Sequence, residues 1–177
     1  MSRLIKGYIH VYTGNGKGKT TAALGQALRA AGSGLKTFIV QFMKDFPYGE
    51  VKSIQQWNEW IELAQYGNDT FVIDKRLPCQ SDFEAAKQGL QRAQEAMLSG
   101  KYDILIMDEV CVAIHFGLLN TETVHLLLEK KPTFVEIILT GRYCPSELIE
   151  KADLVTEMQE IKHYYQKGIE ARKGIES

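Results

Sequence analysis

An apolar segment that runs directly into a glycine- and lysine-rich loop is the most constraining feature of this chain. The stretch from Tyr8 to Thr21 reads YIHVYTGNGKGKTT, and good helix formers follow at Ala22, Ala23 and Leu24. The pattern predicts a strand, a loop and then a helix. In such a loop, glycines let backbone N–H groups curl round an anion, and the helix N-terminus adds a partial positive charge. The stretch therefore predicts a phosphate-binding loop (P-loop) for a nucleoside triphosphate.

The loop supplies the predicted nucleotide-binding residues, which are Thr13, Gly14, Asn15, Gly16, Lys17, Gly18, Lys19, Thr20 and Thr21. Lys19 has the length to reach the outer phosphates, and the Thr20 hydroxyl suits a Mg²⁺ ion. The spacing departs from the usual P-loop at one place, because Thr13 stands where a glycine is expected and Gly14 follows one step later. An ordinary strand-to-helix turn is the alternative, but the Gly-Lys-Thr ending and its flanks favour the P-loop.

A second acidic motif, Ile104-Leu-Ile-Met-Asp-Glu109, places two carboxylates after a short apolar run. Many P-loop proteins hold a metal-binding carboxylate at the end of such a buried strand. Asp108 is expected to hold Mg²⁺ directly or through a water, and Glu109 to be a second ligand or to orient a water. A strand that ends in solvent-facing acids is the alternative. With the P-loop upstream, the sequence predicts a magnesium site formed by Thr20, Asp108 and Glu109.

Six short apolar and β-branched segments recur, at roughly residues 8–13, 37–43, 60–65, 103–108, 134–140 and 154–159. Helical patterns lie between most of them, at Thr20–Ala31, Ser81–Leu98, Thr121–Lys130 and, as a largely apolar stretch, 110–119. Strands that alternate with helices indicate a parallel sheet covered on both faces. The predicted fold is α/β and P-loop NTPase-like (RecA-like), a three-layer sandwich with a mostly parallel sheet of about six strands. We expect one domain, residues 1–177.

Two residues of these helices carry specific predictions about the scaffold. Ser81 stands three positions before Glu84 and is expected to start its helix with a capping box. His115 lies in the apolar stretch and is expected to be a satisfied core residue rather than a catalyst.

The composition disfavours two classes of partner. The formal net charge is −1, and Lys and Arg are spread along the chain, which disfavours a nucleic-acid surface and a polybasic membrane tether. The apolar runs are far shorter than a membrane span, and the N-terminus lacks the apolar core of a signal peptide. Cys79, Cys111 and Cys144 are widely spaced and are expected to be reduced thiols. We therefore expect a cytoplasmic protein with no nucleic-acid or membrane partner.

An arginine follows the fifth apolar segment, where Val135-Glu-Ile-Ile-Leu-Thr-Gly-Arg142 predicts a strand that ends in a turn. The Arg142 guanidinium could meet a phosphate with two parallel hydrogen bonds. An exposed arginine with no anion is the alternative. After the last predicted strand comes a segment rich in Tyr, His and Lys, to which these physical patterns assign no purpose.

The chain as a whole resembles the P-loop type of ATP:corrinoid adenosyltransferase. The resemblance rests on residues 13–21, Val40-Gln-Phe-Met-Lys44 with Gly49-Glu50, Met107-Asp-Glu109, Leu139-Thr-Gly-Arg142, Glu147-Leu-Ile149, Ala152-Asp-Leu-Val-Thr-Glu157 and Lys162-His163 with Lys167-Gly168. The loop of this family also has Thr-Gly at its start, so the departure at Thr13 becomes support. The C-terminal residues narrow the choice, because countless ATPases share the P-loop alone.

The resemblance implies an alkyl transfer with ATP and a corrinoid as substrates. Co(I) of the corrinoid attacks C5′ of ATP and the intact triphosphate departs, so no Ser, Cys or His nucleophile is needed. The implied catalytic residues are Lys19, Lys17 and Arg142, which would stabilise charge on the leaving triphosphate with Mg²⁺. A reduced flavoprotein is implied as the source of electrons, and a homodimer as the assembly.

On the corrinoid side, the resemblance implies Tyr66, Phe71, His163 and Lys167. Relatives place aromatic residues against the lower face of the corrin ring, and Tyr66 and Phe71 are the candidates for that role here. Apolar side chains there could displace the lower axial ligand, which is a major lever on metal potential. A plain core role for Phe71 stays open.

Two other functions remain as alternatives. A P-loop ATPase or small-molecule kinase explains both phosphate motifs and ignores the C-terminal residues. A non-catalytic, ATP-dependent corrinoid-binding protein would bind both ligands without forming a Co–C bond. Products separate the three, since only the adenosyltransferase releases triphosphate.

Overall fold

The computed structural model describes residues 4–45, 48–68, 70 and 77–176, and its centre is a parallel sheet. The strands are β1 (Ile9–Thr13), β2 (Thr37–Phe42), β3 (Ile61–Tyr66), β4 (Ile104–Asp108), β5 (Glu136–Thr140) and β6 (Leu154–Glu157). Their order across the sheet is β3-β2-β4-β5-β1-β6, and each recorded pairing is parallel. The six predicted strands are confirmed.

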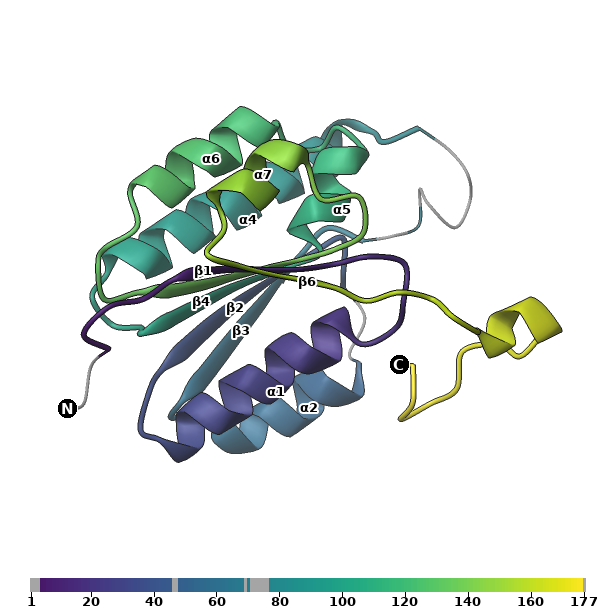
Figure 1. Cartoon of the computed structure of the whole chain (residues 1–177), viewed down its shortest axis with the longest axis horizontal. Helices are drawn as coiled ribbons and strands as arrows, with labels where there is room; N and C mark the ends of the chain where they lie inside the picture. The colour runs from purple at the N-terminus through teal and green to yellow at the C-terminus, as the bar shows by residue number, and fades with distance from the viewer. Residues whose placement is uncertain (1–3, 46–47, 69, 71–76, 177) are drawn as a thin grey trace.

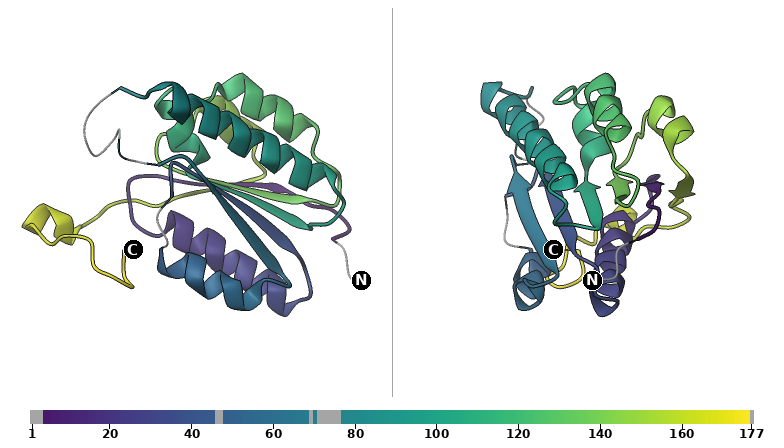
Figure 2. Two further views of the ribbon diagram at one scale, coloured as in Figure 1. Left: turned by 180° about the vertical axis from the view of Figure 1, so that it is seen from behind. Right: turned by 90° about the vertical axis from the view of Figure 1, so that its left-hand side faces the viewer.

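Helices cover both faces of the sheet. They are α1 (Lys19–Gly32), α2 (Gly49–Ile54), α4 (Gln80–Leu98), α5 (Val110–His115), α6 (Thr121–Glu129) and α7 (Ser146–Lys151), with 3-10 turns η1 (Gln55–Trp57) and η2 (Tyr164–Lys167). Helices α1 and α2 lie on one face, and α4, α5, α6 and α7 on the other (Figures 1 and 2). The predicted three-layer sandwich is therefore confirmed.

The continuous apolar runs of the central strands follow from this double cover, because alternate side chains enter two different cores. In β4, Leu105 and Met107 join the core under α4 and α6, whereas Ile104 and Ile106 join the core under α1. All four are at most 1% exposed. Edge strand β6 differs, since its four residues are exposed and it pairs only with β1 among the described strands.

Two predictions about the scaffold are wrong. Helix α4 begins at Gln80, and its capping contact uses the Cys79 backbone N–H, which donates to Asp82 Oδ2 over 2.8 Å. The predicted capping box, Ser81 with Glu84, lies two residues too late. The same three-residue spacing to an acid also occurs between Cys79 and Asp82, and the helix uses that pair. His115 is exposed at the end of α5, where its ring stacks on Tyr143 with 4.1 Å between centroids. The helix ends at that residue, so the ring lies outside the core.

The parallel arrangement brings the ends of four strands to one edge. The loop after β1, the turn after β2 with Lys44, the Asp108-Glu109 pair at the end of β4 and the turn after β5 with Arg142 meet there. In open α/β sheets, ligands bind beyond the carboxyl ends of the strands. The fold therefore gathers the predicted phosphate and metal residues in one place.

Candidate nucleotide and metal site

The P-loop glycines are required by backbone conformation and by close contact. Gly14 and Gly18 have φ values of 94° and 119°, a region that favours glycine. A Cβ on Gly16 would lie 2.7 Å from the carbonyl oxygen of Met158, to which the Gly16 N–H donates over 2.6 Å. The loop is thus shaped both for an anion and for the C-terminal chain that crosses behind it.

Lys19, the first residue of α1, is folded back on its own loop. Its Nζ donates to the carbonyl oxygens of Gly14 and Gly16, each over 2.7 Å. The residue is 8% exposed, and this burial lowers the pKa of the Lys19 ammonium. The negative charge of Glu109 acts in the other direction but is the smaller effect. The ammonium is held at the loop, where an incoming phosphate can replace carbonyl oxygens as its partner.

Asp108 is a buried carboxylate that accepts four hydrogen bonds, two on each oxygen. Oδ1 accepts from the hydroxyls of Thr20 (2.8 Å) and Thr140 (2.7 Å), and Oδ2 accepts from Gln41 Nε2 (3.1 Å) and Lys44 Nζ (2.8 Å). Burial raises the pKa of Asp108, but the Lys44 ammonium and the two hydroxyls outweigh it and hold the pKa below its usual range. Asp108 is therefore ionised and fully hydrogen-bonded.

Glu109 occupies the N-cap position of α5 in a left-handed conformation, with φ of 62°. Its backbone N–H donates to Thr140 Oγ1 over 2.9 Å, and its side chain lines the pocket. Burial, followed by the negative charge of Asp108, raises the pKa of Glu109. The positive charges of Lys44, Lys19 and Arg142 oppose this rise in part.

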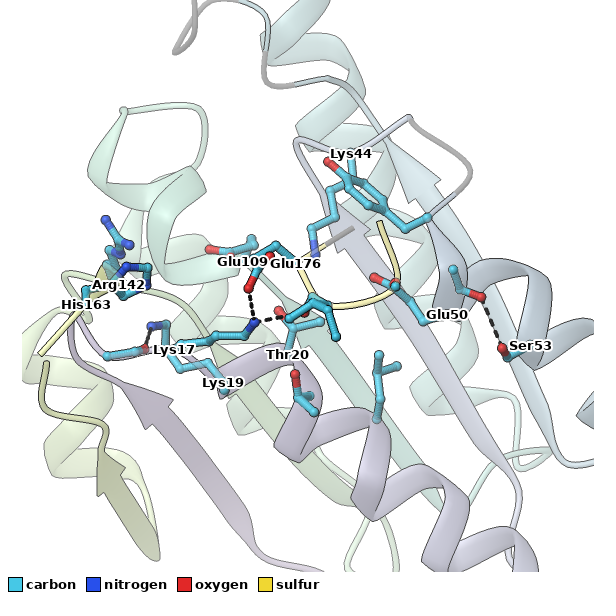
Figure 3. Close-up of a pocket in the computed structure, with 18 residues that line it drawn as sticks. Lys17, Lys19, Thr20, Lys44, Glu50, Ser53, Glu109, Arg142, His163 and Glu176 are labelled. Carbon is cyan, nitrogen blue, oxygen red and sulfur yellow. Dashed lines mark hydrogen bonds and ion pairs between the residues drawn. The ribbon is translucent and has the colours of Figure 1, made fainter. Parts of the chain in front are cut away.

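Lys19, Thr20, Lys44 and Glu109 line one pocket of about 700 Å³. Its walls come from the P-loop and α1, from the turn and helix after β2, from the ends of β4 and β5, and from the C-terminal segment. The cationic or potentially cationic residues of the lining are Lys17, Lys19, Lys44, Arg142 and His163 (Figure 3). Such a concentration of positive charge suits a polyphosphate.

Three non-glycine residues with positive φ stand directly around this pocket. Met43 (φ 57°) follows β2, Glu109 (φ 62°) follows β4, and Tyr143 (φ 59°) follows the turn after β5. Residues other than glycine rarely adopt this backbone conformation, and those that do cluster at functional sites. Glu109 itself lines the pocket. Met43 and Tyr143 are the chain neighbours of Lys44 and Arg142, which also line it.

Two pocket residues carry oxygen atoms of the kind that Mg²⁺ prefers. Thr20 and Glu109 line the pocket, and Asp108 sits behind Thr20 with its oxygens already engaged. No cluster of three or more His, Cys, Asp or Glu side chains suited to a metal occurs in the described part of the chain. Mg²⁺ usually takes one or two protein ligands together with waters and phosphates, so these residues fit it.

The predicted loop residues fall into two groups. Gly16, Lys17, Gly18, Lys19, Thr20 and Thr21 line the pocket. Thr13 is buried as the last residue of β1, and Gly14 and Asn15 form the turn that follows it. The second half of the loop therefore borders the pocket, and the first half turns the chain after β1.

The residues predicted for the corrinoid are scattered. His163 lines the pocket, and its Nδ1 accepts from the Tyr165 N–H over 3.1 Å. Lys167 ends η2 and is exposed. Tyr66, the last residue of β3, packs against the core beside Gly89. Phe71 lies outside the described residues.

Sequence reasoning missed two walls of the pocket. Lys44, Tyr48, Gly49, Glu50 and Ser53 form one, and Gly174, Ile175 and Glu176 form the other. The motif Val40–Lys44 with Gly49-Glu50 carried a resemblance but no role. That motif was the available signal for the first wall.

Comparison with known proteins matches the family described as "ATP:corrinoid adenosyltransferase BtuR/CobO/CobP" over residues 5–177. The chain belongs to this adenosyltransferase family. It is similar to the corrinoid adenosyltransferase of Escherichia coli (strain K12), with 35% identity over 172 residues, 97% of this chain and 86% of that protein. It is also similar to corrinoid adenosyltransferase CobA of Salmonella typhimurium (33%, covering 97% and 86%) and to that of Sinorhizobium sp (34%, covering 97% and 80%).

Membership in the adenosyltransferase family confirms the predicted resemblance. ATP and a corrinoid are the substrates that the family implies. Among the described residues, no helix has both the length and the apolar character needed to cross a bilayer.

Proposed function

We propose that this chain transfers the 5′-deoxyadenosyl group of ATP to Co(I) of a corrinoid, either cobalamin or an early precursor such as cobyrinic acid a,c-diamide. The electron pair of Co(I) forms the Co–C5′ bond, the C5′–O bond breaks, and its electron pair leaves on triphosphate. The nucleophile belongs to the substrate, so the protein has to align the two substrates and stabilise the leaving group.

The cationic lining of the 700 Å³ pocket is the observation that carries this proposal. Lys19 and the loop amides would hold the triphosphate, and Lys17 and Arg142 would add positive charge from the rim. Charge that grows on the leaving oxygens is stabilised most by donors already in place. Chemistry at C5′ requires no general base from the protein, and the lining pairs four Lys and Arg side chains with three glutamates, Glu50, Glu109 and Glu176.

Mg²⁺ is the metal that these residues fit. Thr20 and Glu109 would hold it on the protein side, while Asp108 orients the Thr20 hydroxyl over 2.8 Å. The ion would neutralise triphosphate charge. On the other side of the site, we propose that His163 meets the corrinoid, and that Tyr66, Phe71 and Lys167 contribute if the corrinoid extends toward them.

We propose that residues 1–177 act as one domain in a cytoplasmic homodimer that works on small molecules rather than nucleic acid. A reduced flavoprotein is the proposed electron donor, because Co(I) has to be regenerated from a more oxidised corrinoid. These proposals rest on resemblance and on the near-neutral charge of the chain.

The test is product analysis. Purified protein is incubated with ATP, Mg²⁺ and chemically reduced corrinoid in the dark. The proposal predicts equal amounts of triphosphate and a light-sensitive organometallic corrinoid. Release of ADP and orthophosphate without that corrinoid would indicate an ATPase or kinase, and binding of both ligands without any product would indicate a corrinoid-binding protein.

A further inference from the structure

A lysine outside the P-loop projects into the nucleotide pocket. Lys44 follows β2 directly after Met43, whose φ is 57° and whose backbone N–H donates to the Tyr66 carbonyl over 2.8 Å. The left-handed residue turns the chain sharply at the end of the strand. A strained conformation at a non-glycine residue persists only where surrounding contacts enforce it. The backbone is thus built to hold the position of Lys44.

The Lys44 side chain is held in place by one ion pair and keeps further N–H donors. Its Nζ lies 2.8 Å from Asp108 Oδ2, and the side chains of Lys44 and Asp108 are 16% and 2% exposed. The Tyr48 ring centroid lies 5.6 Å from the same nitrogen. An ammonium has three N–H donors, and the ion pair with Asp108 engages one of them. Because Lys44 also lines the pocket, its remaining donors can reach a bound ligand.

Lys44 and the P-loop approach the pocket from different sides. In Figure 3, Lys44 enters from the side of β2, opposite Lys17 and Lys19, with Thr20 between them. Asp108 links the two sides, because one of its oxygens accepts from Thr20 and the other from Lys44. A single buried carboxylate therefore sets the positions of two groups that face the same space.

A counter-ion for Asp108 would not need this arrangement. Asp108 already accepts three neutral hydrogen bonds, from Thr20, Gln41 and Thr140. A lysine whose only task was to neutralise it could lie in the core without reaching the pocket. Polyphosphates, in contrast, are commonly bound by lysines that act as point charges.

We propose that Lys44 is a second phosphate-binding lysine, which stays paired with Asp108 and donates to the triphosphate of the bound nucleotide from the side of α2. The triphosphate then lies between Lys44 and the P-loop. The inference rests on the proposed function only in taking a nucleoside triphosphate as substrate. Lys44 thereby adds positive charge to the leaving group at the face that Lys19 does not reach.

The test measures binding of inorganic triphosphate by calorimetry to the wild-type chain and to Lys44→Met and Lys44→Arg, in EDTA and with Mg²⁺. Lys44→Met removes the charge, and its affinity is expected to fall about 10- to 100-fold in both buffers, as for loss of a charge-assisted hydrogen bond. Lys44→Arg should recover most of the affinity. Lys36→Met is the matched control, because Lys36 precedes the same strand and lies near Trp60. It should bind like the wild type.

Two results would overturn the proposal. One is an unchanged affinity of folded Lys44→Met in EDTA. The other is a loss that occurs only with Mg²⁺, which would mean that Lys44 acts through Asp108 alone. Since triphosphate binding is read without corrinoid, a failure to form the organometallic product would count against the proposed function and leave this result standing.

A second measurement needs no variant and covers the case in which Lys44→Met does not fold. Wild-type protein is treated with a lysine-acetylating reagent in EDTA, with and without triphosphate, and each lysine is quantified by mass spectrometry. Triphosphate should slow acetylation of Lys44 at least severalfold and leave Lys36 unchanged. Equal acetylation of Lys44 in both samples would overturn the proposal.

Discussion

Lys17 and Glu176 join the P-loop to the C-terminal segment, although 159 positions separate them: Nζ of Lys17 lies 2.7 Å from Oε1 of Glu176. The same nitrogen donates to the Ile175 carbonyl over 2.8 Å (Figure 3). The hydrogen bond to Glu176 is the main cause of a raised pKa at Lys17, and Arg172 and Lys17 lower the pKa of Glu176. A loop that is expected to bind phosphate thus already holds one internal anion.

Replacement of that anion should favour the nucleotide. In Glu176→Gln, the side chain no longer competes with triphosphate for Lys17, and a negative charge leaves the pocket wall. A glutamine side chain keeps the size of Glu176 and its carbonyl oxygen can still accept from Arg172, so the fold should be retained. We expect MgATP to bind about two- to fivefold more tightly by calorimetry, an effect of the size of a rim charge. Glu170→Gln, in the same exposed segment, is the control, and weaker binding by Glu176→Gln would contradict the idea.

The P-loop lysine should be indispensable. Lys19→Ala removes a donor that the loop holds in place before substrate arrives. Loss of one such preorganised donor typically costs about 10²–10³-fold in rate. We expect kcat for adenosyl transfer to fall by at least this factor, while Lys87→Ala, on the exposed side of α4, keeps normal turnover. Wild-type turnover with normal ATP affinity in Lys19→Ala would refute the role.

Two glycines in helices should respond in opposite ways to alanine. A Cβ on Gly89 in α4 would lie 2.8 Å from the Phe42 ring and 3.2 Å from Tyr66, whereas a Cβ on Gly25 in α1 meets nothing within 4 Å. Alanine favours a helix by about 1 kcal/mol over glycine, but overpacking typically costs about 1–3 kcal/mol. Urea denaturation should show Gly89→Ala destabilised and Gly25→Ala stabilised. A gain in stability for Gly89→Ala would mean that the sheet can retreat from the helix.

Acid should weaken one contact between β1 and β5. Glu136 pairs with His10 over 2.6 Å and accepts from the Tyr8 N–H over 2.7 Å. Burial raises the pKa of Glu136, but His10 and the Tyr8 N–H outweigh it and lower the pKa overall. A carboxylate with a lowered folded pKa stabilises the protein above its unfolded pKa, about 4.3, and loses this contribution as pH falls through the folded value.

Glu136→Gln measures that contribution. We expect it to reduce the free energy of unfolding by about 1 kcal/mol at pH 7, a modest figure because solvent screens the pair in part. The difference from wild type should shrink steadily below pH 4. Glu150→Gln, on the exposed face of α7, serves as control. A difference that stays constant from pH 7 to pH 3 would show that packing, not charge, is responsible.

The sheet and half of the site were predictable because they depend on local patterns. Apolar strands buried on both faces are continuous runs, and Gly18-Lys19-Thr20 marks a loop and a helix start within a few residues. Asp108 was predictable from its place at the end of an apolar run. Its four donors were not, because they come from β2 and the turn after it, from β5 and from α1.

The other half of the site depends on contacts between distant parts of the chain. Glu176 reaches Lys17 only because the C-terminal chain crosses behind the loop at Met158. Lys44 reaches Asp108 only because β2 and β4 are neighbours in the sheet. His115 shows the same limit, since periodicity placed it on an apolar helix and gave no sign that the helix would end there.

The left-handed conformations after β2 and β5 also bear on efforts to make this protein more heat-resistant. Glycine at the exposed position 143 would relieve backbone strain of about 1 kcal/mol, whereas glycine at position 43 would also remove a buried side chain from the core. Random mutagenesis scored only by survival on heating would therefore favour Tyr143→Gly over Met43→Gly. The hardier variant would hold Arg142 less firmly, so a screen of this kind should score product formation alongside melting temperature.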